Sequence, residues 1–366
     1  MAGVFKTSAA RWAAIAAVAF SFVSVAFAQH YTRTDLTTNS STVSSAPNVD
    51  PNLVNPWGLS RSTDSPWWIA DNGTGLSTLY DGTGAIVPLV VTIPPPKNTQ
   101  GTAAPTGTVY NYTTSFEVAS GAPAIFLFVT EDGTKSGWNP NVNVNAAVVM
   151  INAPNQAIYK GLALATTAAG PRLYVSNFKT GNVEVYDGNF KRQQAEERFH
   201  DKLPPNYAPF GIQNVGGDIV VTFVQRDPGS EDENDGPGLG FVRVFDTSGN
   251  VLVRVQHGTY LNAPWAIALA PGDFGPFSHR LLIGNFGDGT INAFNAFSGK
   301  FEGTLLDSTT GGSLSIDGLW AISFAGNGAG NGSATELYFS AGPNGESNGV
   351  FGKLTATDSE QRGNTE

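Results

Sequence analysis

Carboxylate and amide side chains recur in this chain at points where short apolar segments end. Five of them occupy such positions: Asp71, Glu131, Asp132, Asn177 and Asn285. Oxygen atoms of these types are the ligands that Ca²⁺ prefers, so a calcium site forms if the segment ends meet at one rim of the fold. The same residue types cap hairpins through Asx turns. Capping is the commoner role in β proteins, and the pattern leaves both interpretations open.

A second group of carboxylates lies in one loop. Residues 227–236 read Asp-Pro-Gly-Ser-Glu-Asp-Glu-Asn-Asp-Gly, and four of them are candidate metal ligands: Asp227, Glu231, Asp232 and Asp235. The loop lacks the Glu at position twelve that an EF-hand requires. Repulsion among so many like charges predicts either a solvated loop or a loop that is ordered by Ca²⁺.

Large aromatic residues recur near the starts of apolar segments, at Trp57, Phe210, Trp265 and Trp320. If these rings gather around a channel mouth, they form a platform for a sugar or a peptide, because aromatic side chains offer a large apolar face. Large residues at such positions more often pack in a core. The sequence therefore makes them candidate ligand-binding residues, with packing as the favoured alternative.

Strong catalytic motifs are missing from the sequence. The histidines show no two-histidine spacing of the kind that zinc sites use, and the chain has neither a cysteine nor a Gly-x-Ser-x-Gly motif. The residues thus favour a binding protein over one with covalent or zinc-dependent catalysis.

The candidate residues belong to a repeat. Each unit opens with a Pro or Gly beside a bulky residue, as in Pro56-Trp57-Gly58-Leu59. The second residue of the units falls at 57, 106, 160, 210, 265 and 320, which gives steps of 49, 54, 50, 55 and 55 residues. Period-two alternation, as in residues 182–187, and Asp-Gly turns predict short strands joined by hairpins. A period near fifty residues built from strands and turns is typical of a propeller blade, so we expect an all-β, six-bladed β-propeller.

The ring is expected to close through the N-terminal part of the chain. The blades should span residues 55–97, 105–154, 158–200, 207–257, 262–307 and 317–355. Residues 31–36 alternate well enough to form a further strand. We expect this strand to pair with the last blade, because closure leaves no sheet edge unpaired.

The first 28 residues have the pattern of a signal peptide. Lys6 and Arg11 flank the start of an apolar stretch, and Ala26-Phe27-Ala28 fits a cleavage site. The expected organisation is a signal peptide at 1–28, a propeller at 29–355 and a polar C-terminal tail at 356–366. We therefore expect an exported protein, periplasmic or extracellular, with no membrane span in the mature chain.

Composition narrows the class of partner. Without Lys6 and Arg11 the chain keeps 18 basic and 30 acidic residues, a net charge of −12. This charge opposes binding to nucleic acid or to anionic membranes. The absence of cysteine means that no disulfide framework accompanies export. The expected partner is an extracytoplasmic peptide, glycan or small molecule.

Several segments resemble known propeller families. The strand starts and the aromatic-Asp strand ends are similar to those of NHL-type repeats. Residues 55–59, 130–140 and 174–178 resemble an uncharacterised family of exported bacterial propeller proteins, over nearly the whole mature chain. This resemblance implies a fold and export but no reaction. Distant six-bladed relatives include Ca²⁺-dependent lactonases, which bind the metal through the residue types found at Glu131, Asn177, Asn285 and Asp71.

These observations favour a non-catalytic binding or scaffolding module with its ligand site at a channel mouth. The alternative is a Ca²⁺-dependent hydrolase that acts on lactones or similar esters. Ca²⁺ is the cofactor that the residues suggest.

Overall fold

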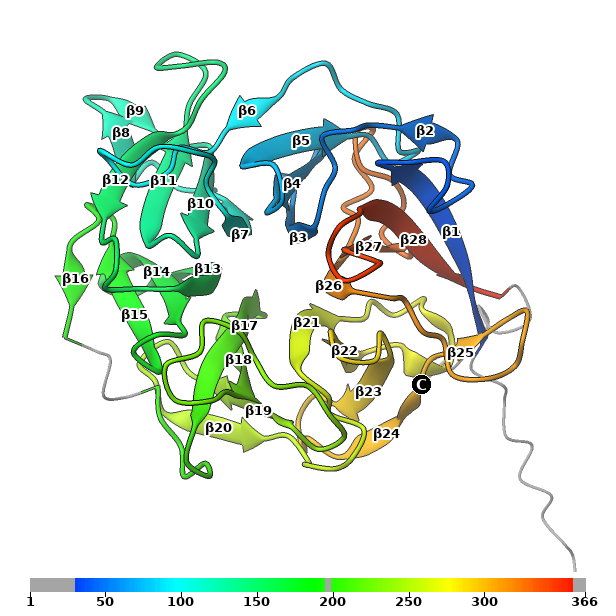
Figure 1. The fold of residues 1–366 in the computed structure, drawn as a ribbon. Helices are drawn as coiled ribbons and strands as arrows, with labels where there is room; N and C mark the ends of the chain where they lie inside the picture. Colours follow the sequence, from blue (N-terminus) through cyan, green and yellow to red (C-terminus); the bar gives the residue numbers. More distant parts are fainter. Residues whose placement is uncertain (1–29, 195–198, 358–366) are drawn as a thin grey trace, which may run out of the picture.

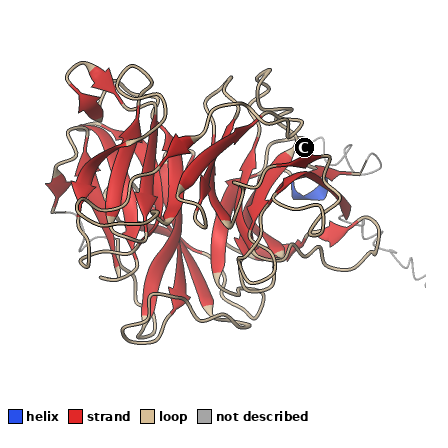
Figure 2. Ribbon diagram, turned by 45° about the horizontal axis from the view of Figure 1, so that its top comes forward, coloured by secondary structure: helices blue, strands red, loops and turns tan. Residues whose placement is uncertain are grey.

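The computed structural model describes residues 30–194 and 199–357, in which six β-sheets form a ring around a central channel (Figure 1). The described residues contain one short 3-10 turn, η2 (Gly275–Phe277), beside the strands (Figure 2). The predicted all-β, six-bladed propeller is confirmed. The predicted signal peptide and most of the C-terminal tail lie outside the described residues. Within the described ranges, no helix has the length and apolar character needed to cross a membrane.

In the first five blades, strands follow one another in chain order from the channel outward, each antiparallel to the next. The first two blades contain β3 (Pro56–Ser60), β4 (Trp67–Asp71), β5 (Leu76–Tyr80) and β6 (Val91–Thr92), then β7 (Pro105–Tyr110), β10 (Phe126–Thr130), β11 (Thr134–Trp138) and β12 (Val148–Asn152). The third contains β13 (Tyr159–Thr167), β14 (Gly170–Asn177), β15 (Asn182–Asp187) and β16 (Arg192–Gln193). A short hairpin of β8 (Glu117–Ala119) and β9 (Ala122–Pro123) is inserted after β7.

The fourth and fifth blades repeat this order. They contain β17 (Tyr207–Val215), β18 (Asp218–Gln225), β19 (Gly240–Phe245) and β20 (Val251–Arg254), then β21 (Pro264–Leu269), β22 (Arg280–Asn285), β23 (Ile291–Asn295) and β24 (Phe301–Thr304). The inner strands β3, β7, β13, β17 and β21 therefore begin at one face of the ring and end at the other. The inner strand of the sixth blade does the same.

The sixth blade joins the two ends of the described chain. It contains β26 (Leu319–Phe324), β27 (Leu337–Ala341), β28 (Val350–Ala356) and β1 (His30–Thr38), with the short strands β2 (Asn48–Val49) and β25 (Leu306–Asp307) beside β1. β1 pairs antiparallel with β28, with Tyr31 opposite Ala356 and Thr38 opposite Val350. The blue strand β1 lies beside the red strand β28 in Figure 1. The predicted closure by an N-terminal strand is confirmed.

Small residues let the inner strands approach one another closely. One position of the inner strand is held by glycine or alanine in every blade: Gly58, Gly107, Gly161, Gly211, Ala266 and Ala321. A Cβ atom on Gly58 would lie 2.6 Å from the carbonyl oxygen of Thr106, and one on Gly211 would collide with that of Trp265. Because real Cβ atoms do not fit at such distances, larger residues are excluded and the ring is tight.

Hydrophobic cores fill the space between neighbouring blades. Between the sixth and first blades, the ring of Trp67 lies 4.7 Å from that of Tyr338. Between the first and second, Trp68 stacks on Phe126 at 4.2 Å. All four side chains are buried, and burying one large apolar side chain contributes about 1.5–3 kcal/mol. The cores fix the blades relative to one another and thereby fix the residues at the two faces of the ring.

The variant Gly211→Ala tests the close approach of the inner strands. We expect it to lower the free energy of unfolding by about 1–3 kcal/mol, the usual range for overpacking, because the new Cβ collides with the Trp265 backbone. Urea unfolding followed by tryptophan fluorescence measures this change. Gly312→Ala is the matched control, since a Cβ there meets no atom closer than 3.7 Å. An unchanged unfolding midpoint for Gly211→Ala would contradict the tight packing.

Candidate functional site

The face where the inner strands begin also receives the ends of the second strands. The antiparallel register places Pro56 opposite Asp71 and Pro264 opposite Asn285. Side chains from several blades therefore meet there around the channel. We call this opening the acidic mouth and define it by Glu131, Lys160, Glu233 and Glu346.

The four aromatic residues singled out in the sequence lie beneath the acidic mouth and form an aromatic plug: Trp57, Phe210, Trp265 and Trp320. Trp57 stacks on Trp320 with ring centroids 3.5 Å apart, and Trp265 packs edge-on against both at 6.1 and 5.9 Å. None of the four is more than 9% exposed. The rings fill the channel and do not stand free at its mouth. Their direct contact with a ligand stays a prediction.

Lys160 takes the place of an aromatic residue in the third blade. Its buried Nζ lies 2.6 Å from Glu131 Oε1 and 3.7 Å from Glu233 Oε2. The ammonium group also lies 5.1 Å from the centre of the Trp57 ring, within the range of a cation–π interaction. Burial disfavours the charge, but the carboxylates of Glu131 and Glu233 outweigh burial and raise the pKa of Lys160. The positive charge of Lys160 is thus matched inside the fold.

Two asparagine side chains connect Glu131 to the sixth blade. Asn72 Nδ2 donates to Glu131 Oε2 at 2.8 Å, and Asn55 Nδ2 donates to Asn72 Oδ1 at 3.3 Å and to Glu346 Oε2 at 2.6 Å. Asn55 has a φ of 47°, a left-handed conformation that Asn adopts more readily than most residues. Burial raises the pKa of Glu346. These contacts hold two carboxylates of the mouth in fixed positions.

The acidic loop, residues 227–236, reaches this mouth through Glu233. The Glu233 side chain is 8% exposed. Burial raises the pKa of its carboxyl group to about 7, although the nearby charge of Lys160 opposes this rise. The loop is therefore ordered at Glu233 by an ion pair and by burial, a third possibility beside the solvated and the Ca²⁺-ordered loop.

The two groups of carboxylates that the sequence kept apart line one cavity. It has a volume of about 460 Å³, and four acidic residues line it: Glu131, Asp132, Glu231 and Asp232. Burial raises the pKa of Asp132, and the charges of Glu131 and Glu231 add to this rise. The other two loop candidates do not line this cavity: Asp227 accepts a hydrogen bond from Asn234 within the loop, and Asp235 is exposed.

Asp71, Asn177 and Asn285 are held by contacts within their own blades. Asp71 Oδ2 accepts hydrogen bonds from the backbone N and Oγ1 of Thr78 at 3.0 and 2.8 Å. Asn177 Nδ2 donates to Glu184 Oε1, and Asn285 Nδ2 donates to the carbonyl of Tyr260, each at 2.8 Å. Burial raises the pKa of Asp71 well above its usual value. These hydrogen bonds are of the kind that cap hairpins, and metal binding by the three residues stays a prediction.

The placement of Glu131 corrects the repeat alignment by one residue. Thr130 lies opposite Pro105, as Asp71 lies opposite Pro56. Thr130 is therefore the equivalent of Asp71, and Glu131 and Asp132 lie in the turn that follows. The turn position lets both carboxylates line the cavity.

Sequence reasoning missed the residues at the centre of the site: Lys160, Glu233, Glu346, Asn55 and Asn72. Lys160 could have been found, because it is the one charged residue at a repeat position that is aromatic in four blades. Glu233 has no local pattern that separates it from its acidic neighbours. The roles of Glu346 and Asn55 depend on contacts across the closed ring, which a single sequence does not display.

No group of three or more His, Asp or Glu side chains in the described ranges is arranged to hold a metal ion. Glu131 is bound to Lys160 and Asn72, and Asp132 Oδ2 accepts a hydrogen bond from Ala104 N at 2.7 Å. A Ca²⁺ ion at the cavity would depend chiefly on Glu231 and Asp232, which are exposed. Calcium binding therefore stays a prediction.

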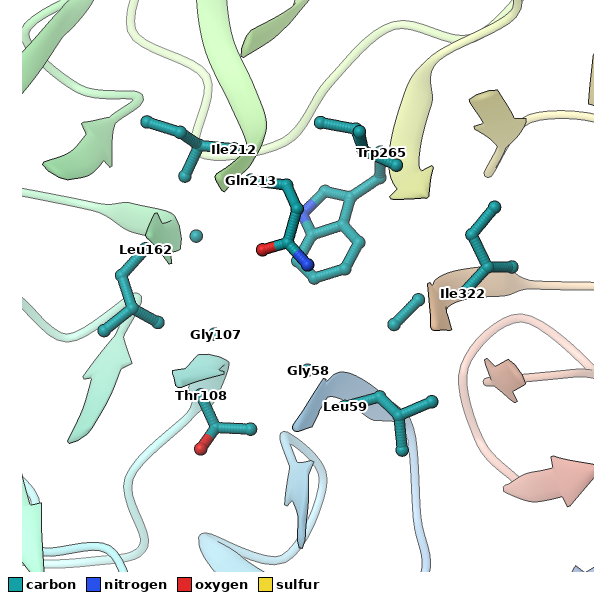
Figure 3. Close-up of a pocket in the computed structure, with 12 residues that line it drawn as sticks. Gly58, Leu59, Gly107, Thr108, Leu162, Ile212, Gln213, Trp265 and Ile322 are labelled. Carbon is teal, nitrogen blue, oxygen red and sulfur yellow. The ribbon is translucent and has the colours of Figure 1, made fainter. Parts of the chain in front are cut away.

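Below the plug, the channel narrows to a cavity of about 40 Å³ that is lined by all six inner strands (Figure 3). This volume holds a few water molecules at most. Trp265 closes it at one end, and the side chain of Gln213 points into it. The acidic mouth and the opening on the opposite face are therefore separate sites.

Comparison with known proteins gives relatives of unknown activity. No family model matches the chain. Uncharacterized proteins R648 and L690 of Acanthamoeba polyphaga mimivirus are 32% and 30% identical to it over 286 and 320 residues. The alignments cover 75% and 84% of this chain, and 69% and 82% of those proteins. These relatives are viral and not bacterial.

Solved structures with a similar fold include enzymes. Virginiamycin B lyase from Staphylococcus aureus matches with a TM-score of 0.50 and 13% identity, over 90% of this chain and all of that chain (100%). A glucose dehydrogenase matches with a TM-score of 0.51 and 12% identity, over 84% of this chain and 98% of its own. At these identities the likeness shows the β-propeller fold alone.

The raised pKa of Glu233 predicts a dependence of stability on pH. The carboxyl pKa is 4.5 in the unfolded chain and about 7 in the folded protein. Between these values the folded protein keeps a proton that the unfolded chain releases. The stability linked to Glu233 is therefore full below pH 4.5 and is lost as the pH rises through 7.

We expect the variant Glu233→Gln to lack this loss, and so to show a flatter stability profile between pH 4.5 and 7 than the unchanged protein. Urea unfolding at a series of pH values measures the profile. Glu117→Gln, which changes an exposed glutamate, is the matched control and should leave the profile as it is. Equal profiles for Glu233→Gln and the control would contradict the raised pKa of Glu233.

Proposed function

Since the chain belongs to the same protein family as the uncharacterised mimivirus proteins R648 and L690, we infer its function from the site itself and propose a non-catalytic binding module. Its ligand site is the cavity at the acidic mouth. The ligand is a peptide or small molecule that presents a cationic group, such as an ammonium or a guanidinium. A cation-bearing glycan is included in this class.

The observation that carries this proposal is the excess of carboxylates at one cavity. Four acidic side chains line it, and among the residues that the structure describes Lys179 is the one basic side chain that does. Lys160 pairs with one of the four, Glu131, and three carboxyl groups are left at the cavity beside Lys179: Asp132, Glu231 and Asp232. Like charges that share a site destabilise one another, and a bound cation relieves this repulsion. The volume of about 460 Å³ lies within the usual range for ligand pockets.

Binding is favoured over catalysis by the state of the carboxylates. A general base needs a carboxylate that is free to accept a proton from a substrate. Glu131 is instead held by Lys160 and Asn72, and no histidine of the described ranges lines the cavity. The lyase and dehydrogenase with a similar fold share too little sequence to transfer a reaction.

The proposal places this binding outside the cytoplasm. It rests on the signal-peptide pattern of residues 1–28 and on the resemblance to exported bacterial propeller proteins with NHL-like repeats. A mature net charge of −12 supports a protein partner or a small molecule over a nucleic acid. The removal of the first 28 residues is part of the proposal.

Thermal melting tests the binding of cations at the acidic mouth. At constant ionic strength, spermidine, a lysine-rich hexapeptide or millimolar CaCl₂ should raise the melting temperature, because a ligand of the folded state stabilises it by about 2.7 kcal/mol at a hundredfold excess over Kd. Glu231→Gln and Asp132→Asn should remove most of the rise. Glu117→Gln, an exposed glutamate outside the cavity, is the matched control. A melting temperature that responds neither to these cations nor to a chelator would refute the proposal.

The alternative of a Ca²⁺-dependent hydrolase is tested directly. Purified protein should not turn over a panel of lactones and aryl esters, with or without Ca²⁺, because Glu131 is held by Lys160 and Asn72 and is not free to act as a general base. Turnover that a chelator abolishes, and that Glu131→Ala also abolishes, would make the hydrolase the better assignment. Glu117→Ala serves as the control for nonspecific loss of activity.

A further inference from the structure

The opening opposite the acidic mouth lies where the inner strands end, and we call it the neutral mouth. Two cavities of about 330 and 210 Å³ meet there, and Gln213 lines both of them as well as the narrow channel. Arg61 is the one charged side chain among the described residues that line these two cavities. The neutral mouth therefore offers a different chemistry from the acidic mouth.

The guanidinium group of Arg61 is hydrogen-bonded to backbone carbonyl groups. Its Nε and Nη2 donate to the carbonyl of Phe324 at 3.0 and 2.6 Å, and its Nη1 donates to the carbonyl of Ser62 at 3.1 Å. The guanidinium also lies 5.5 Å from the centre of the Trp67 ring. These contacts fix the loop beside the mouth and leave Arg61 poorly placed to recognise an anion.

Gln213 supplies an amide that the fold does not use. Its side chain points into the channel (Figure 3) and forms no hydrogen bond with any residue that the structure describes. A glutamine amide can donate two hydrogen bonds and accept others. The neighbouring Asn214 is fixed instead, because its Nδ2 donates to the carbonyl of Leu164 at 2.7 Å. The Ser60 hydroxyl accepts a hydrogen bond from Tyr110 N at 2.9 Å, and its O–H group can donate a hydrogen bond to a ligand.

Aromatic surface lies beside this amide. Tyr110 and Tyr112 both line the larger cavity. Tyr112 is 52% exposed, and its hydroxyl has one long contact of 3.5 Å to Thr166 Oγ1. An exposed ring at the edge of a cavity offers a flat apolar face together with a polar tip.

We propose that the neutral mouth binds an uncharged saccharide. A pyranose ring has an apolar face of C–H groups that packs on an aromatic ring, and hydroxyl groups at its edge that donate and accept hydrogen bonds. Tyr112 and Gln213 offer both kinds of partner at one cavity of about 330 Å³, a usual size for a ligand pocket. No carboxylate lines either cavity within the part of the chain that the structure describes, which favours an uncharged ligand over a cationic one. The site lies on the opposite face from the acidic mouth, so this proposal does not depend on the function proposed above.

Saturation-transfer NMR and calorimetric titration with maltotetraose, cellotetraose and chitotetraose test this inference on the mature protein. At least one of the three should bind. Gln213→Ala should weaken binding by about three- to tenfold, through the loss of one or two hydrogen bonds. Tyr112→Ala should weaken it by up to about tenfold through the loss of ring contact. Tyr112→Phe, which keeps the ring, should bind nearly as well as the unchanged protein.

Two controls separate this site from others. Phe297→Ala removes an aromatic side chain that is 92% exposed and lies outside both cavities of the mouth, and it should leave saccharide binding unchanged. Glu231→Gln should also leave it unchanged while it reduces cation binding. Melting curves confirm that each variant is folded. The proposal is overturned if none of the three saccharides binds at millimolar concentration, or if binding survives both Gln213→Ala and Tyr112→Ala. Binding of an uncharged tetrapeptide in place of the saccharides, with the same loss in both variants, would also overturn it.

Discussion

The antiparallel pairing of β1 with β28 is the contact on which the rest of the structure depends. It joins residues that are more than three hundred positions apart in the chain and turns a row of sheets into a ring. Across this closure, Trp320 Nε1 donates to Asn55 Oδ1 at 2.9 Å, and Asn55 Nδ2 donates to Glu346. The stack of Trp57 on Trp320 crosses the same boundary. The acidic mouth therefore forms only in the closed ring, because these contacts between the first and sixth blades form only when the ring is closed.

The two most deeply buried lysines show how the surroundings decide the role of a charge. Lys135 Nζ lies 3.2 Å from Glu184 Oε2 and 2.9 Å from the hydroxyl of Tyr186. Burial lowers its pKa to about 7, although Glu184 opposes the shift. Glu184 also pairs with Arg192, so Lys135 and Arg192 share one carboxylate. Lys160 has two carboxylate partners, and its pKa rises. At the first site one carboxylate, Glu184, faces two cations, Lys135 and Arg192. At the second site two carboxylates, Glu131 and Glu233, face Lys160 alone. This excess of negative charge favours the binding of a further cation.

The sequence predicts the fold well because a propeller repeats a local pattern. Strand alternation, hairpin turns and the period of about fifty residues are all visible in one chain, and the number of blades follows from them. The position of Glu131 shows the limit of this reasoning. Thr130, and not Glu131, pairs with the first residue of the inner strand, so Glu131 lies in the turn and lines the cavity, and no local pattern in the sequence marks this difference of one residue. The burial of Glu233 depends on contacts with Lys160, which lies in another blade, so the sequence shows an acidic loop but not which of its carboxylates is buried.

Trp265 is the residue through which the two mouths could influence each other. Its Nε1 donates to the carbonyl of Lys160 at 2.9 Å on the acidic side, and its ring lines the channel together with Gln213 on the other (Figure 3). The ring is packed edge-on against both Trp57 and Trp320. Close-packed side chains of this size have no second position to occupy without displacing their neighbours. A ligand at one mouth would have to move the whole aromatic plug to alter the other. The geometry therefore favours two independent binding sites on one rigid ring over a pair of coupled sites.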